Sequence, residues 1–352
     1  MDEKIKKNGL TRRDFVKGTA AGIGGVAALG FPAIVKAQNK PIKWRLQGYY
    51  PSTAEAGKYG PLWAKSITEL TEGRLTVEYS EPGAIVPVGE SFQNVADGTI
   101  DACQAFGPFY RGLMPEVDIE AGLPFAWETP SEIHDAFYHR GLLEEIRKVY
   151  ADYNVFYCCP CYGNLIYGFS TVDPIRKPED FKGKKIRDLG LSADWVAHYG
   201  AAPTSLPAGE MYMALKMKTI SGVHYGVAVL EDLKIGEVCK YFLIEPNTGT
   251  CTMNLFCSMK SFKKLPPDLQ KIVADYSLPL VLPVVVGWDE IRSLAEIKRK
   301  YGVEAVRWPK EDVDKGRAYM IEKLWPKVAA KSPRCKKLVD MIVEQAKHYG
   351  KI

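Results

Sequence analysis

Hydrophobic and polar residues follow two different periods along the chain, so strands and helices are predicted in turn. Residues 43–49 and 75–79 alternate with a period of two, which predicts strands whose successive side chains point to opposite faces. Apolar positions three and four apart predict helices at 54–70 and 131–150. Strands are also predicted at 100–106, 155–162 and 185–187, and helices at 90–96 and 192–199. This alternation is typical of an α/β fold.

The pattern changes after Pro266, where the chain becomes mostly helical to its end. The clearest amphipathic segments there are 288–301 and 335–348.

A short motif is repeated at an offset of 120 residues. Residues 87–92 (PVGESF) return as 207–212 (PAGEMY), and the Thr-Ile pair at 99–100 returns at 219–220. In both copies we expect the Gly-Glu pair to open a helix and the Thr-Ile pair to begin a strand. Two similar α/β domains with a cleft between them are implied. The alternative is coincidence, because only five of eighteen aligned positions are identical.

The N-terminus reads as a targeting segment. Residues 11–17 (TRRDFVK) contain paired arginines, 18–32 are apolar and rich in Gly and Ala, and 35–37 offer a small-x-small cleavage site. We therefore expect residues 1–37 to be a signal peptide that directs export to the periplasm by the twin-arginine route. A membrane anchor fits less well, because the apolar stretch is shorter than the roughly 20 residues that span a bilayer and is broken by glycines.

Removal of residues 1–37 would leave 40 basic and 39 acidic residues, a net charge of +1. Such a balance argues against nucleic acid as a partner. About 315 residues remain, enough for two domains with ordinary cores.

The motifs of common enzymes are absent from the sequence. None of the five histidines belongs to an H-E-x-x-H pattern, and there is neither a G-x-S-x-G elbow nor a G-x-x-x-x-G-K-[ST] phosphate loop. We therefore do not expect an enzyme.

Eight cysteines include the cluster Cys158-Cys159-Pro160-Cys161, whose C-x-x-C could be redox-active or hold a metal. Thioredoxin-type sites place this motif at the start of a helix. Here an aromatic, strand-like segment follows at 162–169, which favours buried cysteines in a strand.

Arg187 is the residue whose position suggests binding, since it lies where the strand at 185–187 should end. A guanidinium there could hold a carboxylate with two parallel hydrogen bonds. A surface salt bridge with Asp188 is the alternative from the residues alone. Tyr167, Tyr212 and Tyr225 could line a cleft wall, although such aromatic residues also form ordinary cores.

Six segments, in this order and spacing, resemble a known family, the DctP solute-binding receptors of tripartite ATP-independent periplasmic (TRAP) transporters. The segments are 73–78 (GRLTVE), 97–101 (DGTID), 180–187 (DFKGKKIR), 200–203 (GAAP), 206–215 (LPAGEMYMAL) and 265–270 (LPPDLQ).

The resemblance implies a periplasmic-binding-protein fold, in which two α/β domains joined by a long bridging helix close on a ligand like a clam. We expect domain I at 38–163 plus 251–290 and domain II at 164–250 plus 291–352. It also implies delivery of the ligand to a membrane permease of a small and a large subunit.

The resemblance further implies roles for individual residues. Arg187 matches the family's carboxylate-binding arginine, and Tyr225 stands at a ligand-contacting position. Asn164 and Tyr167 lie in a segment that supplies a second polar contact, where the glutamine of some members is Leu165. A Glu-Trp pair that holds a metal in some members is here His224-Tyr225, so we expect no cofactor and leave His224 as a ligand contact or wall residue.

The sequence thus predicts a periplasmic receptor for a small organic anion, a monocarboxylate with a hydroxy, oxo or aryl substituent. The expected ligand-binding residues are Arg187, Tyr225, Asn164, Tyr167, Tyr212 and His224. The alternatives are a sulfonate receptor of the same type, an exported redox or metal protein that uses Cys158 to Cys161, and an enzyme on the same scaffold.

Overall fold

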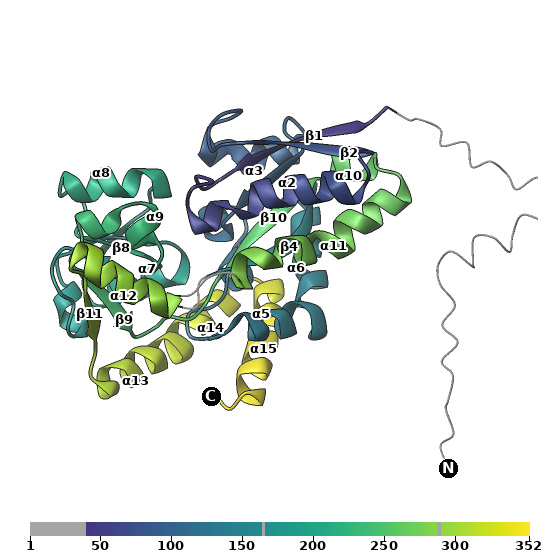
Figure 1. The fold of residues 1–352 in the computed structure, drawn as a ribbon. Coiled ribbons are helices and arrows are strands. Elements are labelled where there is room, and N and C mark those ends of the chain that lie inside the picture. The colour runs from purple at the N-terminus through teal and green to yellow at the C-terminus, as the bar shows by residue number, and fades with distance from the viewer. Residues whose placement is uncertain (1–39, 164–165, 287–289) are drawn as a thin grey trace, which may run out of the picture. The chain divides into compact units, whose positions relative to one another are not determined.

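Two mixed β-sheets organise the chain between residues 41 and 352 (Figure 1). The computed structural model describes residues 40–163, 166–286 and 290–352. The predicted signal peptide at 1–37 lies outside the described residues.

The first sheet has the strand order β2-β1-β3-β10-β4. Its strands are β1 (Ile42–Gly48), β2 (Leu75–Ser80), β3 (Ala102–Ala105), β4 (Val155–Tyr162) and β10 (Thr252–Ser258). β1 pairs in parallel with β2 and β3, whereas β10 runs antiparallel to β3 and β4. Every residue of β10 is buried, which is why this strand reads as a continuous run without polar-apolar alternation.

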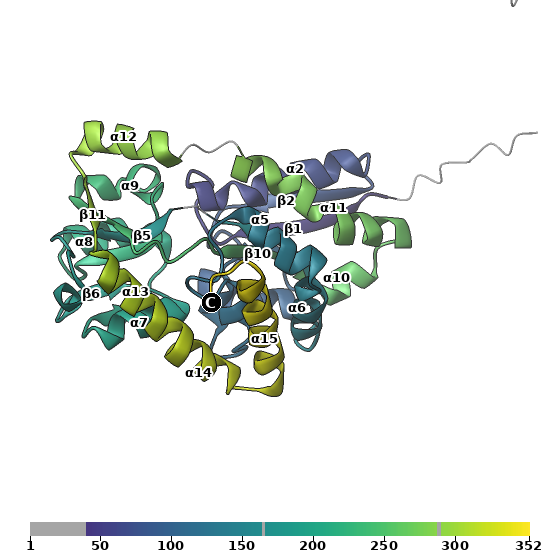
Figure 2. The same cartoon turned by 90° about the horizontal axis from the view of Figure 1, so that it is seen from below.

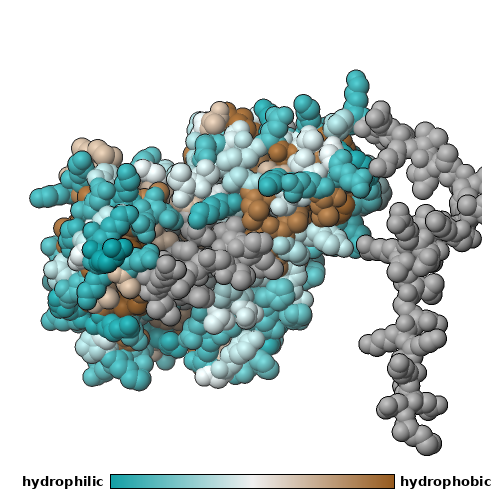
Figure 3. Space-filling view, in the orientation of Figure 1, coloured by the Kyte–Doolittle hydropathy of each residue, from teal (hydrophilic) through white to brown (hydrophobic). Residues whose placement is uncertain are grey.

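Helices cover this sheet with their apolar faces. They are α2 (Tyr59–Leu70), α3 (Ser91–Ala96), α4 (Val117–Glu120), α5 (Pro130–His134), α6 (Leu142–Ala151), α10 (Met259–Lys263) and α11 (Pro267–Val286). α2 buries Trp63 and Ile67 against the sheet and packs on α11. On the face seen in Figure 3, hydrophobic residues gather over α2 and α11 within a surface that is otherwise mostly hydrophilic. None of the helices among the described residues has the length and apolar character to cross a membrane.

The second sheet has the order β11-β9-β5-β8-β6-β7. Its strands are β5 (Tyr167–Thr171), β6 (Lys185–Arg187), β7 (Ala202–Thr204), β8 (Gly222–Gly226), β9 (Tyr241–Glu245) and β11 (Glu304–Arg307). Its helices include α7 (Gly190–His198), α8 (Met211–Lys216), α9 (Val229–Asp232) and α12 (Glu290–Tyr301). β11 was not predicted, because its four residues are too few for a periodic pattern to stand out in a helical region.

The two copies of the repeated motif fold alike, which confirms the predicted internal repeat. Each begins with a proline of extended backbone, followed by one turn of 3₁₀ helix and then by α3 or α8. Thr99 N–H donates to the carbonyl of Asn94 at 2.8 Å, and Thr219 N–H donates to that of Ala214 at 2.9 Å. The two halves of the chain therefore share one local design, with a strand of each sheet following the motif.

The C-terminal segment consists of α13 (Lys310–Tyr319), α14 (Trp325–Ala329) and α15 (Pro333–His348). The last helix, α15, packs against α4 and α6, which cover the first sheet (Figure 2). Residues 333–348, which we assigned to domain II, therefore contact helices assigned to domain I. The domain boundaries themselves stay a prediction.

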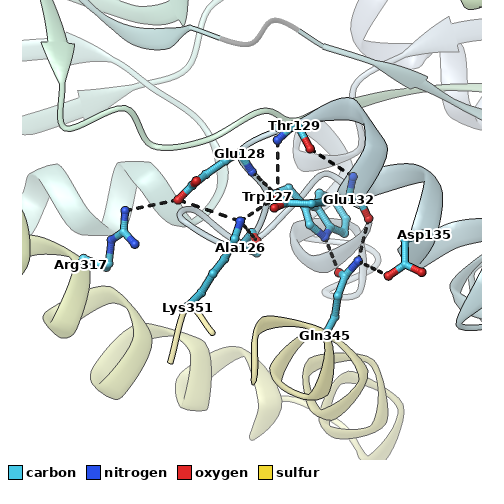
Figure 4. Close-up of polar contacts among 9 residues, drawn as sticks. All are labelled: Ala126, Trp127, Glu128, Thr129, Glu132, Asp135, Arg317, Gln345 and Lys351. Carbon is cyan, nitrogen blue, oxygen red and sulfur yellow. Dashed lines mark hydrogen bonds and ion pairs between the residues drawn. The ribbon is translucent and has the colours of Figure 1, made fainter. Parts of the chain in front are cut away.

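Polar contacts fasten this segment to the loop before α5 (Figure 4). Gln345 accepts a hydrogen bond from the indole of Trp127 at 2.8 Å and donates to the carbonyl of Glu132 at 2.7 Å. Lys351 donates to Glu132 at 2.7 Å and to the carbonyl of Ala126 at 3.1 Å. Gln345 and Lys351 thus anchor residues 126–132. This segment directly follows residues 121–124, which form part of the pocket described below.

The predicted bridging helix corresponds to α11 and α12. α11 packs on β4 and α2 of the first layer, while α12 contacts the turn at 235–237 beside the second sheet. The residues between these two helices, 287–289, lie outside the described part. α11 thus packs beside the first sheet and α12 beside the second, and one continuous bridging helix stays a prediction.

Candidate functional site

A small pocket of about 40 Å³ lies between the two layers of the fold, each of which consists of one sheet with the helices and loops that pack on it. On one side it is formed by the loops around α4 and by residues 248–251, which connect β9 to β10. On the other side lie the end of β6, the start of α7, and residues of β5 and β8. Chemically distinctive lining residues are Asp118, Tyr167, Arg187, Asp188, Ser192, His224, Thr248 and Thr250.

Arg187 ends β6 as predicted, and only 2% of the residue is exposed. Its Nε donates to the carbonyl of Leu206 at 3.2 Å and its Nη1 donates to the carbonyl of His224 at 3.3 Å. Nη2 is buried and has no hydrogen-bond partner among the described residues. The two carbonyl groups that accept from Arg187 are neutral, so they do not balance its charge. The alternative of a surface salt bridge is wrong, because the side chain is buried. The guanidinium therefore offers a charged donor to the pocket.

Asp188 follows Arg187 and is 4% exposed. Its Oδ1 accepts hydrogen bonds from the N–H of Leu189 at 2.7 Å and from Ser192 Oγ at 2.6 Å. His224 Nδ1 lies 2.8 Å from the same oxygen. One carboxylate oxygen is thus fully engaged, whereas Oδ2 is buried and has no partner in the part of the chain that the structure describes.

His224 is held in the wall behind Arg187. Its Nε2 lies 3.0 Å from Thr248 Oγ1, so both ring nitrogens have partners. Its ring stacks on Phe169 with centroids 4.2 Å apart. These contacts suit a residue that positions Asp188 and Arg187.

A group of tyrosine rings packs together beside the guanidinium, with Tyr225 in contact with it. Tyr225 lies with its ring centroid 5.7 Å from Arg187 Cζ, within the range of a cation–π contact. Tyr167 stacks on Tyr225 at 6.0 Å, and Tyr50 from the first layer meets Tyr225 edge-on at 6.4 Å. Burial raises the pKa of all three hydroxyls, so each stays neutral at physiological pH. The sequence pattern did not indicate Tyr50.

Asp118 on α4 contributes from the opposite layer and is 2% exposed. Its Oδ2 pairs with Arg111 Nη2 at 3.1 Å and with Lys331 Nζ at 3.3 Å. Its Oδ1 is buried without a partner among the described residues. Burial raises the pKa of Asp118, and the two cations oppose that rise. The only signal in the sequence was an acidic residue within the mostly apolar stretch 117–126.

Arg111 connects the two layers beside this pocket. Besides Asp118 it donates to the carbonyl of Gly190 at 3.0 Å and to Asp194 at 2.9 Å, both in α7. The contact between the layers therefore runs next to the pocket.

One of the predicted ligand-binding residues, Tyr212, does not line the pocket. It is on α8, where its hydroxyl donates to Glu237 at 2.8 Å. Asn164 lies outside the described residues, so its predicted role stays a prediction. Arg187, Tyr167 and His224 line the pocket, and Tyr225 contacts both Arg187 and Tyr167.

The cysteine cluster lies within β4, which confirms the prediction of buried strand cysteines. Cys158, Cys159 and Cys161 are completely buried, and burial raises the pKa of the Cys159 thiol. The described residues contain no group of three or more His, Cys, Asp or Glu side chains that could hold a metal ion. A buried thiol with a raised pKa is a poor nucleophile, so Cys159 lacks the reactive thiolate of a thioredoxin-type site.

Comparison with known proteins places this geometry in a family. Residues 49–281 match the model of bacterial extracellular solute-binding protein, family 7 (DctP). A monocarboxylate 2-oxoacid-binding periplasmic protein of Nostoc sp. is 24% identical over 261 residues, which cover 72% of this chain and 70% of the relative.

Solved structures of TRAP periplasmic solute-binding proteins share the fold. One from Pseudoalteromonas atlantica, with bound sodium and pyruvate, has a TM-score of 0.80 at 22% identity and covers 88% of this chain and 95% of its own. One from Colwellia psychrerythraea, with bound calcium and pyruvate, has a TM-score of 0.78 at 24% identity with the same coverage. The two-domain α/β periplasmic-binding-protein fold is thereby confirmed.

Proteins of this kind are transport receptors and not enzymes, as the sequence predicted. They are periplasmic, bind small organic ligands and work with a membrane permease. The chain belongs to the DctP family of bacterial extracellular solute-binding proteins, the receptors of TRAP transporters.

Proposed function

We propose that this receptor captures a small monocarboxylate through Arg187 and delivers it to the small and large subunits of a TRAP permease. The observation that carries the proposal is the unpartnered Nη2 of a guanidinium that is 2% exposed. A buried donor without a partner costs free energy, and a charged one costs more. A ligand carboxylate would supply both the missing hydrogen bond and the opposite charge.

The size of the pocket supports a short acid. One water molecule needs a cavity of roughly 10–15 Å³, so a cavity of about 40 Å³ suits a ligand of a few heavy atoms. The Nostoc relative is named for 2-oxoacid monocarboxylates, and two structural neighbours hold pyruvate. Neutral tyrosines beside Arg187 would enclose the body of such a ligand.

We propose that binding needs no resident metal, although those neighbours hold sodium or calcium. Both nitrogens of His224 are already hydrogen-bonded, and hard cations prefer several oxygen ligands. The described residues present no cluster of three metal-ligating side chains near Arg187. Affinity should therefore persist after dialysis against a chelator.

We also propose that residues 1–37 direct export to the periplasm by the twin-arginine route. The paired arginines, the short apolar stretch and the small-residue cleavage site support this proposal. Fusion of these residues to a reporter and replacement of Arg12 and Arg13 by lysine tests it, and continued export of the fusion by the general secretory route would refute it.

Arg187→Ala tests the proposed function. A thermal-shift screen of short organic acids, with sulfonates as a second arm, finds ligands, because a ligand at about 100 times its Kd adds about 2.7 kcal/mol of stability. Loss of a buried charged partner costs about 2–5 kcal/mol, so calorimetry should show affinity lowered roughly 30-fold or more.

The matched control for this variant is Arg176→Ala. This substitution removes a half-exposed arginine that pairs with Glu304 in β11, a strand of the sheet that also contains Arg187. It should leave affinity unchanged. Equal affinity of the Arg187 variant and the wild type would remove Arg187 from the site, and tighter binding of a sulfonate than of any carboxylate would change the headgroup.

A further inference from the structure

We infer that the ligand carries a hydroxyl group beside its carboxylate, and that Asp118 accepts the one hydrogen bond that this hydroxyl can donate. The inference rests on the proposed function and narrows its ligand class from short monocarboxylates in general to short hydroxy acids. Nothing in the family comparison assigns a ligand-binding role to either aspartate.

Both aspartates line the pocket, and each has one buried oxygen without a hydrogen-bond partner among the described residues. Asp188 Oδ1 is held by Leu189, Ser192 and His224, which leaves Oδ2 buried and unpartnered. Asp118 Oδ2 is held by Arg111 and Lys331, which leaves Oδ1 in the same condition. In each case one oxygen fixes the carboxylate and the other lacks a donor.

The free oxygens come from opposite sides of the pocket. Asp188 follows β6 of the second sheet, whereas Asp118 lies on α4 over the first. The hypothetical Cβ of Gly190, next to Asp188 in the wall, would lie 3.4 Å from Asp118 Oδ1, so the two walls are in close approach. A hydroxyl bound here has a single proton, which it would donate to the unpartnered oxygen of Asp118.

An acceptor group could not satisfy these oxygens. A 2-oxo acid presents only lone pairs, which repel a carboxylate oxygen, whereas the hydroxyl of a hydroxy acid donates. A site built to hydrogen-bond a substrate hydroxyl discriminates strongly against an analogue that lacks it, because buried polar groups are then left unpaired.

A neutral donor fits better than an ammonium group. The charge of Asp118 is already opposed by Arg111 and Lys331. This carboxylate therefore needs a hydrogen bond more than a positive charge. This distinguishes hydroxy acids from amino acids of the same size.

Isothermal calorimetry on the wild-type protein tests the inference with matched pairs: glycolate and glyoxylate, lactate and pyruvate, 2-hydroxybutyrate and 2-oxobutyrate. Alanine and propionate complete the series, and each titration is run in chelator and in calcium. We expect the tightest hydroxy acid to bind at least 10-fold more tightly than its oxo partner and than propionate or alanine, without added metal.

Three results would overturn the inference: an oxo acid that binds as tightly as its hydroxy partner, an amino acid that binds most tightly, or binding of the hydroxy acid only with calcium. Failure of every organic acid to bind would instead contradict the proposed function, so the two failures are distinct.

Asp118→Ala and Asp194→Ala locate the effect. Both remove an aspartate that pairs with Arg111, but Asp194 does not line the pocket. The preference for the hydroxy acid over its oxo partner should fall below about threefold in Asp118→Ala and stay unchanged in Asp194→Ala. An unchanged preference in a folded Asp118 variant would remove Asp118 from the site, and the wild-type series decides the ligand class if that variant does not fold.

Discussion

Glu120 should make the stability of this receptor depend on pH. The residue is completely buried at the end of α4, where Tyr157 donates a hydrogen bond to its Oε1 at 2.9 Å and Tyr150 lies 3.4 Å from its Oε2. Burial raises its pKa from 4.5 to about 7, and the hydrogen bonds from the tyrosines and Thr252 only partly offset this rise.

The direction of the pH dependence follows from comparing the folded and the unfolded chain. Between pH 4.5 and 7 the folded protein keeps a proton on Glu120 that the unfolded chain releases, so stability falls as pH rises through this range. Above pH 7 the folded state holds a buried carboxylate. The difference between the pKa of Glu120 in the unfolded chain, 4.5, and in the folded protein, about 7, corresponds to about 3 kcal/mol in the free energy of unfolding.

Glu120→Gln should remove this dependence. The amide has the shape of the protonated acid and its Nε2 can donate to the hydroxyl oxygen of Tyr150. Unfolding by urea, followed by tryptophan fluorescence at pH 5, 6, 7 and 8, should show a variant that matches the wild type at pH 5 and is up to about 3 kcal/mol more stable at pH 8.

Glu116→Gln serves as the control, because Glu116 accepts a hydrogen bond from Ser332 and not from Tyr150 or Tyr157. It should keep the pH slope of the wild type. A Glu120 variant whose stability changes with pH in parallel with the wild type would show that Glu120 is ionised in the folded protein throughout, and the reasoning would be refuted.

Two further predictions concern the core. Gln345→Ala leaves the buried indole N–H of Trp127 without its acceptor, so chemical unfolding should show that the free energy of unfolding falls by about 1–3 kcal/mol. In a protein that already carries Trp127→Phe, the same Gln345→Ala substitution should be nearly neutral. A thiol reagent such as dithionitrobenzoate should react with the native protein at most at Cys251, the one cysteine that is not fully buried, and rapid labelling of Cys158 or Cys159 would contradict the buried position of β4.

Much of the fold could be predicted because local signals were strong. β4 matches its predicted bounds, and the repeated motif marked the starts of α3 and α8. β11 could not be predicted, since pairing with β9 and not its own four residues makes it a strand.

The site was only partly predictable for a related reason. Arg187 could be chosen because a strand end and a family resemblance coincide there, and its burial was then found in the structure. Asp118 lines the pocket and Tyr50 contacts Tyr225 only because helices and loops of the first sheet pack against the second, which no local pattern records. Tyr212 belongs to the repeat, but its ring points to Glu237, so a motif that shapes the fold did not supply a pocket residue.

The burial of the thiols bears on the order of folding and export. Seven of the eight cysteines are buried, and the sulfur atoms of Cys158 and Cys257 lie only 3.7 Å apart. A chain that crossed the membrane unfolded would present every thiol to an oxidising compartment before the strands that hide them had formed. A chain folded in the reducing cytoplasm would arrive with its thiols already shielded. For this protein, export after folding would protect the native chain from mispaired disulfides even if it carries no cofactor.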